Sequence, residues 1–137
     1  MKASGGCLCG QLRYEIDGDD PMWTGCCYCS DCQKETGAGH LTAIAVAASD
    51  IQTSGKLSTF SKIGDSGGEV IRSFCPECGT TIFGRPVVMG EMRVVRAGTL
   101  DDSSSVKPER AVYCSRAASW DQPLDGVMQF AEMPPRG

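Results

Sequence analysis

The sequence has no excess of basic residues. It contains 13 lysine and arginine residues against 17 aspartate and glutamate residues, which gives a formal net charge of −4. Proteins that bind nucleic acids usually carry a basic surface, because neutralising phosphate groups supplies much of their affinity. Nothing in this composition provides such a surface, so we expect no nucleic-acid partner.

Long hydrophobic runs are also missing. A membrane-spanning helix needs about 18 or more consecutive apolar residues. The longest apolar run, residues 41–48, includes Thr42 and has the length of a strand. The first seven residues, Met1 to Cys7, lack the apolar core of a signal peptide. We therefore expect a cytoplasmic protein with no membrane partner.

Length and composition favour one domain with a modest core. The 137 residues are 41% hydrophobic and 22% charged, as in ordinary globular proteins. The 17 glycines and seven prolines indicate many turns, and hence short strands rather than long helices. Heptads, low-complexity segments and internal linkers are absent. We expect a single domain over residues 1–137.

Strand signals dominate the chain. Leu12, Tyr14 and Ile16 alternate with polar residues, which predicts a half-buried strand. A turn follows at residues 17–21, where glycine, aspartate and proline gather. The other predicted strands cover residues 22–28, 41–47, 56–60, 70–74, 80–83 and 92–97. This pattern indicates an all-β fold.

The segments between these strands are short. Residues 30–35 could form one or two helical turns, with Ser30 as the cap and Gly37 as the stop. Residues 64–68 are predicted to be a hairpin tip or a flexible loop, and residues 101–108 a polar loop. Phe60 and Phe83 are most simply core residues. Trp120 is expected either to line a pocket or to anchor the C-terminal tail together with Phe130.

Nine cysteines are the most informative feature of the sequence. Seven of them fall in three clusters, at residues 7–9, 27–32 and 75–78. In a reducing cytosol, cysteines are more often ligands or nucleophiles than disulfide partners. An odd number of cysteines also fits pairing poorly. The sequence therefore predicts metal binding.

The first and last clusters complement each other. Cys7 with Cys9, and Cys75 with Cys78, supply two thiolates each, and four thiolates close a tetrahedral zinc site. A metal ion bound by both pairs would close the long loop between them and stabilise the fold. The alternative is a separate, weaker site at each pair. We favour the shared site because neither pair alone fills a tetrahedron.

The middle cluster supplies three thiolates, from Cys27, Cys29 and Cys32. A fourth coordination position is then left for another ligand, as in catalytic zinc sites. Cys26 could close the site, but neighbouring strand residues point to opposite faces. We therefore favour a buried thiol for Cys26. His40, the only histidine, could serve as a ligand or move protons, although an ordinary hydrogen bond is the simpler interpretation.

These clusters resemble the glutathione-dependent formaldehyde-activating enzymes, whose relatives include centromere protein V. The matching segments read GCLCG at residues 6–10, CYCSDCQK at 27–34 and FCPECGT at 74–80, followed by Trp120. They occur in the family's order and span nearly the whole chain. Relatives often carry histidine where Tyr28 stands here, a departure that we expect to affect only the surroundings of the site.

The resemblance implies a β-tent fold, in which zinc staples small antiparallel sheets with one or two short helical turns. It implies two Zn²⁺ ions per chain. It also implies a carbon–sulfur lyase that adds glutathione, or a similar small thiol, to formaldehyde or a small aldehyde and so forms an S-hydroxymethyl thiol. The structural zinc would be held by Cys7, Cys9, Cys75 and Cys78, and the catalytic zinc by Cys27, Cys29 and Cys32.

The charge of the three-cysteine site agrees with this chemistry. Three thiolates on Zn²⁺ leave a net charge of 2 − 3 = −1, so the centre suits a soft thiol better than water. A fourth thiolate would make the charge −2, and we expect a nearby cation or N–H donor. Lys34 is the nearest candidate in the sequence, although a solvated lysine is the simpler interpretation.

Two other functions stay open. The chain could be a zinc-stabilised scaffold that binds another protein without catalysis. It could also be a thiol carrier or a metal-responsive binder, in which the three-cysteine site senses rather than turns over. An open cluster favours the enzyme, whereas the resemblance alone does not fix the substrate.

Overall fold

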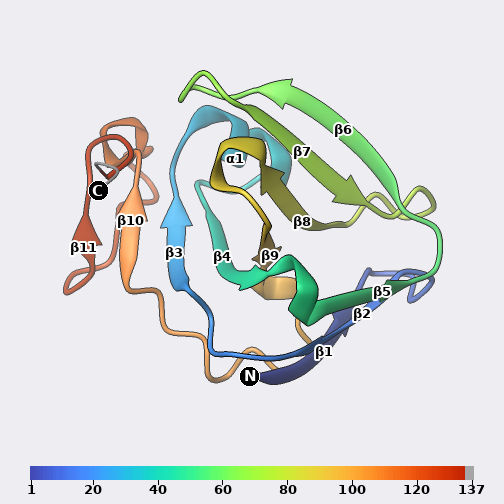
Figure 1. Ribbon diagram of the computed structural model, residues 1–137. Helices are drawn as coiled ribbons and strands as arrows, with labels where there is room; N and C mark the ends of the chain where they lie inside the picture. The colour runs from blue at the N-terminus through green and yellow to red at the C-terminus, as the bar shows by residue number, and fades with distance from the viewer. Residues whose placement is uncertain (135–137) are drawn as a thin grey trace. The chain divides into compact units, whose positions relative to one another are not determined.

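The computed structural model describes residues 1–134 and confirms the all-β class. Strands account for 41% of the residues and helical turns for 14%, with a single α-helix among the described residues (Figure 1). The chain forms two compact units. Unit 1 comprises Met1–Trp23 and Ile44–Val106, and unit 2 comprises Thr24–Ala43 and the chain from Lys107 onward. The expectation of one domain across residues 1–137 stays a prediction.

Unit 1 contains a three-stranded antiparallel sheet in the order β1-β2-β5. Its strands are β1 (Lys2–Gly6), β2 (Arg13–Asp17) and β5 (Ile51–Ser54). The alternation predicted for β2 is present, since Tyr14 and Ile16 are buried between more exposed neighbours. Strands β1 and β5 were not predicted, because neither has a run of alternating apolar residues.

The remaining strands of unit 1 follow one another along the chain. They are β6 (Ser58–Ile63), β7 (Glu69–Phe74), β8 (Thr81–Pro86) and β9 (Met92–Arg96). Neighbouring strands in this series pair antiparallel. Residues 64–68 form the predicted hairpin tip between β6 and β7, where the Gly64 N–H donates to the Gly68 carbonyl at 2.8 Å.

The core of unit 1 contains residues from several of its strands and loops. One residue that was expected in this core, Phe60, is absent from it. Leu12, Ile82 and Val95 are fully buried and pack in the same cluster as Phe83. Phe60 is 59% exposed, so its expected place in the core was wrong. The reason is that β6 lies at the edge of its sheet and leaves most of its side chains in solvent.

Unit 2 contains four elements: β3 (Trp23–Cys27), α1 (Ser30–Thr36), β10 (Arg110–Val112) and β11 (Met128–Gln129). The first residue of β3, Trp23, belongs to unit 1. Strand β10 pairs parallel with both β3 and β11, a difference from the antiparallel pairing expected. Strand β4 (Leu41–Ala47) passes from unit 2 into unit 1 and has the predicted bounds.

The ends of α1 are set by two residues. Cys29, rather than the expected Ser30, is the N-cap, and its sulfur accepts the Cys32 N–H. Gly37 ends the helix as predicted, with a left-handed φ of 69° that suits glycine.

A small apolar core packs beside α1. It contains Cys29, Cys32, Leu41, Val112 and Tyr113, and Phe130 packs against it. Phe130 therefore anchors the tail as expected. Trp120 is 72% exposed, so the anchoring role considered for it was wrong. None of the helices within residues 1–134 is long and apolar enough to cross a membrane.

Candidate metal centres

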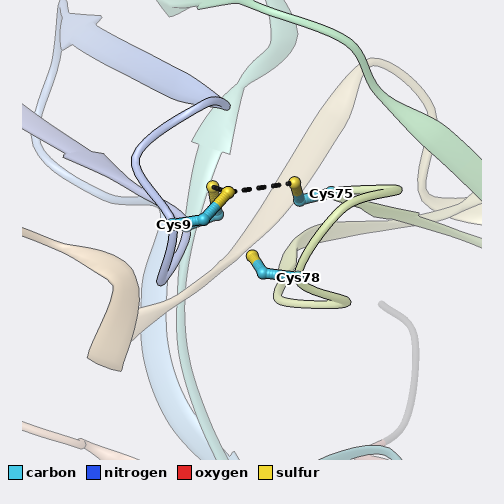
Figure 2. Close-up of side chains that lie close together, drawn as sticks. Cys9, Cys75 and Cys78 are labelled. Atoms are coloured by element: carbon cyan, nitrogen blue, oxygen red, sulfur yellow. Dashed lines mark hydrogen bonds between the residues drawn. The ribbon is translucent and has the colours of Figure 1, made fainter.

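The first cysteine cluster joins two loops of unit 1. Cys7 and Cys9 lie between β1 and β2, and Cys75 and Cys78 lie between β7 and β8. The four sulfur atoms are within 4.8 Å of one another. The Cys9 and Cys75 sulfurs, 66 positions apart in the sequence, are separated by 3.8 Å (Figure 2). The structure thus brings together the four residues predicted to share one site.

The sulfur spacing fits a zinc ion. The Cys7 and Cys9 sulfurs are 3.6 Å apart and the Cys9 and Cys75 sulfurs 3.8 Å apart. A tetrahedron with Zn–S bonds of about 2.3 Å places its sulfurs about 3.8 Å from each other. A disulfide would require about 2.05 Å, and all of the cysteines are free. The donor set and its size therefore match a closed Zn²⁺ site.

Each loop turns through a glycine. Gly10 has a φ of 82° and donates its N–H to the Cys7 carbonyl, and Gly79 has a φ of 78° and donates to the Cys75 carbonyl. A Cβ at either position would meet nothing within 4 Å. The need for glycine is therefore conformational. A register shift between Ser73 and Phe74, just before Cys75, re-aims the end of β7 toward the site.

Hydrogen-bond donors surround these sulfurs. The Leu12 N–H donates to the Cys7 sulfur at 3.2 Å. Thr80 Oγ1 lies 3.3 Å from the Cys78 sulfur and accepts the Leu8 N–H at 3.1 Å. Hydrogen bonds from the Thr80 hydroxyl and backbone lower the pKa of Cys78 to about 5. Sequence analysis missed Thr80, although its place directly after Cys78-Gly79 was a usable signal.

The second cluster lies at the junction of β3 and α1. Cys27 ends the strand, Cys29 caps the helix and Cys32 lies in its first turn. Their sulfur atoms are within 4.8 Å of one another, and the group contains no fourth histidine, cysteine or carboxylate among residues 1–134. Cys29 and Cys32 are buried and Cys27 is half-buried. The structure thus brings the three predicted residues together with one coordination position to spare.

Cys29 is the cysteine of this cluster whose pKa is lowered. The Cys32 N–H at the start of α1 donates to the Cys29 sulfur at 3.4 Å. Interaction with the neighbouring Cys27 and Cys32 thiols, and then with the backbone at the start of α1, lowers the pKa of Cys29 to about 2. The same interaction with Cys29 raises the pKa of Cys27 to about 12. The N–H donor expected near the site is therefore the first turn of the helix, whereas Lys34 is exposed in the last turn.

The other candidate residues lie outside this cluster. The Cys26 sulfur is 3.4 Å from Thr42 Oγ1 and is not among the grouped thiols. His40 contacts Asp121 through Nδ1 at 2.5 Å, and its ring centroid is 4.9 Å from that of Tyr28. The simpler interpretation of His40, an ordinary hydrogen bond, therefore agrees with the structure.

Tyr113 is a neighbour of the cluster that sequence analysis missed. It packs with Cys29 and Cys32, and burial followed by the charge of the three thiols raises its pKa. Its φ of 56° and ψ of 37° are left-handed, which costs a non-glycine residue roughly 1–2 kcal/mol. The sequence carries no signal for this conformation, since tyrosine rarely adopts a positive φ.

One glutamine ties the cluster to the segment that carries Tyr113. Gln33 Nε2 donates to the Tyr28 carbonyl at 2.9 Å and to the Arg116 carbonyl at 3.0 Å. Tyr28 lies between two of the grouped cysteines, and Arg116 ends the 3-10 turn η4 (Cys114–Arg116). The Gln33 amide therefore fixes the position of η4 relative to residues 27–32.

Comparison with known proteins found a solved structure of similar fold and a matching family. A crystal structure of a Rhodobacter sphaeroides protein, a structural-genomics target, aligns with a TM-score of 0.59 over 77% of this chain and 91% of that one, at 22% identity. This likeness concerns the fold. None of the curated proteins matches the sequence significantly. The sequence model of the glutathione-dependent formaldehyde-activating enzymes matches residues 2–116, and the chain therefore belongs to that family.

Proposed function

We propose that the protein is a zinc-dependent carbon–sulfur lyase that adds a small thiol, such as glutathione, to formaldehyde or a similar small aldehyde. The observation that carries this proposal is the cluster of Cys27, Cys29 and Cys32, which has three sulfur donors and no fourth protein donor among the described residues. Family membership supports the reaction class. The product would be an S-hydroxymethyl thiol.

The two donor sets support two metal ions per chain. The four sulfurs of the first cluster would hold a structural zinc, and the three sulfurs of the second would hold a zinc with an open position. Zinc at the second cluster would bind an incoming thiol and favour its thiolate form at neutral pH. The nine free cysteines also support the cytoplasmic location expected from the sequence.

The residues of the chain prepare the second cluster for a negatively charged sulfur. The N–H group of Cys32 donates to the Cys29 sulfur at 3.4 Å and offsets part of the negative charge. Leu41 and Val112 pack beside the cysteines and limit the access of water. A thiolate held there is poorly solvated, which makes its attack on a small carbonyl carbon easier.

Exchange NMR with glutathione and ¹³C-formaldehyde tests the proposal directly. The zinc-loaded protein should speed the exchange between free formaldehyde and the adduct beyond the uncatalysed rate. Cys29→Ser protein at the same concentration is the matched control and should give only the uncatalysed rate. Equal rates with and without wild-type protein would reject the enzyme function.

A protein-binding scaffold is the second candidate. Three large apolar side chains along one segment of unit 2, Trp120, Leu124 and Met128, are each more than 60% exposed. Exposed apolar side chains in such number favour a binding surface. Full zinc content without any acceleration of adduct exchange would support this candidate over the enzyme.

A further inference from the structure

Tyr113 occupies a backbone conformation that its neighbours impose. It is the one non-glycine residue with a positive φ in the described part of the chain. Its N–H donates to the Glu132 carbonyl at 3.2 Å, and its own carbonyl accepts the Arg116 N–H at 3.0 Å. Just before it, the Val112 carbonyl accepts the Tyr28 N–H at 3.0 Å. Strain that is held in place in this way is characteristic of functional positions.

The ring of Tyr113 is fixed beside the three-cysteine cluster. It packs in the same buried group as Cys29 and Cys32. The Arg116 guanidinium lies over this ring, with its central carbon 5.1 Å from the ring centroid. Gln33 binds the Arg116 and Tyr28 carbonyls together, so the turn that carries Arg116 is held next to the segment that carries the cysteines.

The hydroxyl of Tyr113 differs from its ring in being accessible. Tyr113 is 8% exposed, and none of the hydrogen bonds of the described residues involves its hydroxyl. An unpartnered polar atom must either be enclosed or reach solvent. Arg85 Nε is the one enclosed side-chain polar atom without a partner among the described residues. The Tyr113 hydroxyl, which also has no partner, therefore reaches solvent. By contrast, the Tyr14 hydroxyl is used internally, at 2.8 Å from Thr99 Oγ1. A buried tyrosine whose hydroxyl has no hydrogen-bond partner in the protein can donate a hydrogen bond to a ligand.

We propose that the Tyr113 hydroxyl donates a hydrogen bond to the oxygen of the aldehyde while the thiol adds to its carbon. This inference rests on the function proposed above. The sulfur lone pair forms the new carbon–sulfur bond, and the π electrons of the carbonyl move onto oxygen. That oxygen takes up one proton from solvent, which replaces the proton that the thiol released, so no redox partner is needed. Tyr113 keeps its own proton and stabilises the charge that develops on oxygen.

The substitution Tyr113→Phe tests this role because it keeps the ring and removes only the hydroxyl. We expect kcat for adduct exchange to fall about 100-fold, as for loss of one donor to a developing oxyanion. The KM for the thiol should stay within about twofold of the wild-type value, since the thiol is held elsewhere. Tyr14→Phe is the matched control, and its kcat should equal that of the wild type.

Cobalt substitution supplies a readout that does not depend on turnover. The visible spectrum of the Co²⁺-loaded protein should change on addition of glutathione, and Tyr113→Phe protein should show the same change at the same thiol concentration. An altered spectrum or a weakened affinity for glutathione would overturn the proposal, because Tyr113 would then be shaping the cluster. If the wild type is active and Tyr113→Phe protein has the same kcat, the role proposed for Tyr113 is overturned, but the proposed function is not. An inactive wild type would reject the proposed function as well.

Discussion

Adjacent cysteines at the end of β3 have different surroundings. The Cys27 sulfur joins the three-thiol cluster, whereas the Cys26 sulfur contacts Thr42 Oγ1 at 3.4 Å. Successive side chains of a strand point to opposite faces, so the two thiols separate although their backbones are joined. The position beside Cys27 thus supplies no fourth ligand.

Metal content should distinguish these cysteines. We expect Cys26→Ser protein to bind two zinc ions per chain, the number proposed for the wild type, because the Cys26 sulfur lies outside both clusters. Cys29→Ser protein should bind about one, since two sulfurs hold Zn²⁺ poorly. Elemental analysis of the purified proteins measures both values. A loss of zinc from Cys26→Ser protein would mean that Cys26 is a ligand.

A second residue-level prediction concerns the end of α1. Gly37 has a φ of 69°, and a Cβ added there would meet nothing within 4 Å, so Gly37→Ala introduces strain without a clash. We expect the free energy of unfolding to fall by about 1 kcal/mol. Gly98→Ala is the control, because Gly98 also has open space and lacks a positive φ. Urea denaturation compares the two, and an equal effect would exclude backbone strain as the cause.

Among the strands, β6 and β8 show how position in a sheet decides burial. Both are six residues long and carry one phenylalanine, but β6 is an edge strand with mostly exposed side chains. Phe60 on β6 is 59% exposed, and Phe83 on β8 is 8% exposed. An apolar residue in an edge strand contributes little to the core and adds a risk of aggregation.

The two phenylalanines should respond differently to truncation. We expect Phe83→Ala to lower the free energy of unfolding by about 3–5 kcal/mol, because it leaves a cavity in the core. Phe60→Ala should change it by less than about 0.5 kcal/mol, as for other surface substitutions. Thermal or urea unfolding tests both variants. A similar cost for the two would show that Phe60 is buried in solution.

An ion pair links β2 to the loop after β9. The Arg13 guanidinium binds the Asp101 carboxylate, with Nη1 3.0 Å from Oδ1, and Ser4 on β1 donates to the same carboxylate. The hydrogen bonds from Arg13 and then Ser4 lower the pKa of Asp101.

The pair should therefore stabilise the protein above the pKa of an unfolded aspartate, about 3.9. This stabilisation should be lost as the pH falls through the lower pKa of the folded state. Wild type should exceed Asp101→Asn in stability at pH 7, and the difference should shrink below about pH 4. Urea titrations at several pH values check this. A difference that grows toward acid would contradict the sign.

Over the whole chain, each compact unit has its own cysteine cluster. The first cluster brings Cys9 and Cys75 together across 66 positions, and so closes a long loop of the chain. The second cluster spans six residues at the end of one strand and the start of one helix. Only the first closes a loop long enough to matter greatly for folding.

Disrupting each cluster in turn should have different effects, on stability for the first cluster and on ligand binding for the second. Cys75→Ser should destabilise unit 1 severely, because a cross-link over such a loop contributes roughly 4 kcal/mol. Cys32→Ser should keep the strands of unit 1 and lose glutathione binding. Hydrogen exchange of the strand amides and calorimetry with glutathione measure the two effects. Glutathione binding by Cys32→Ser protein would exclude the second cluster as the thiol site.

Sequence patterns predicted the elements that have strong local signals. Strand β4 had the expected bounds because its apolar residues are continuous, and α1 ended at Gly37 as its glycine indicated. Strands β1 and β11 were missed, since KASGG and MQ become strands only through pairing with other segments. Phe60 was misplaced because hydrophobicity alone does not show which strand lies at an edge.

The candidate sites divide in the same way. Spacing predicted the two cysteine pairs and the three-cysteine group, whose members are close in the chain, and the need for four ligands joined the two pairs in one site. The N-cap role of Cys29 and the bonds of Gln33 and Thr80 depend on backbone geometry, which composition does not reveal. Tyr113 was beyond prediction, since its left-handed backbone results from contacts with Glu132 and Arg116.

The first cluster is uneven in its exposure, and this has a consequence for metal exchange. Cys75 is fully enclosed, whereas Cys9 is exposed on its loop. A competing chelator or an oxidant such as peroxide would reach the Cys9 sulfur before the other three. Departure of a bound ion would then begin by detachment of the amino-terminal loop, while residues 75–78 retain the ion longest. The lifetime of a zinc-loaded protein would therefore depend on how readily that loop detaches.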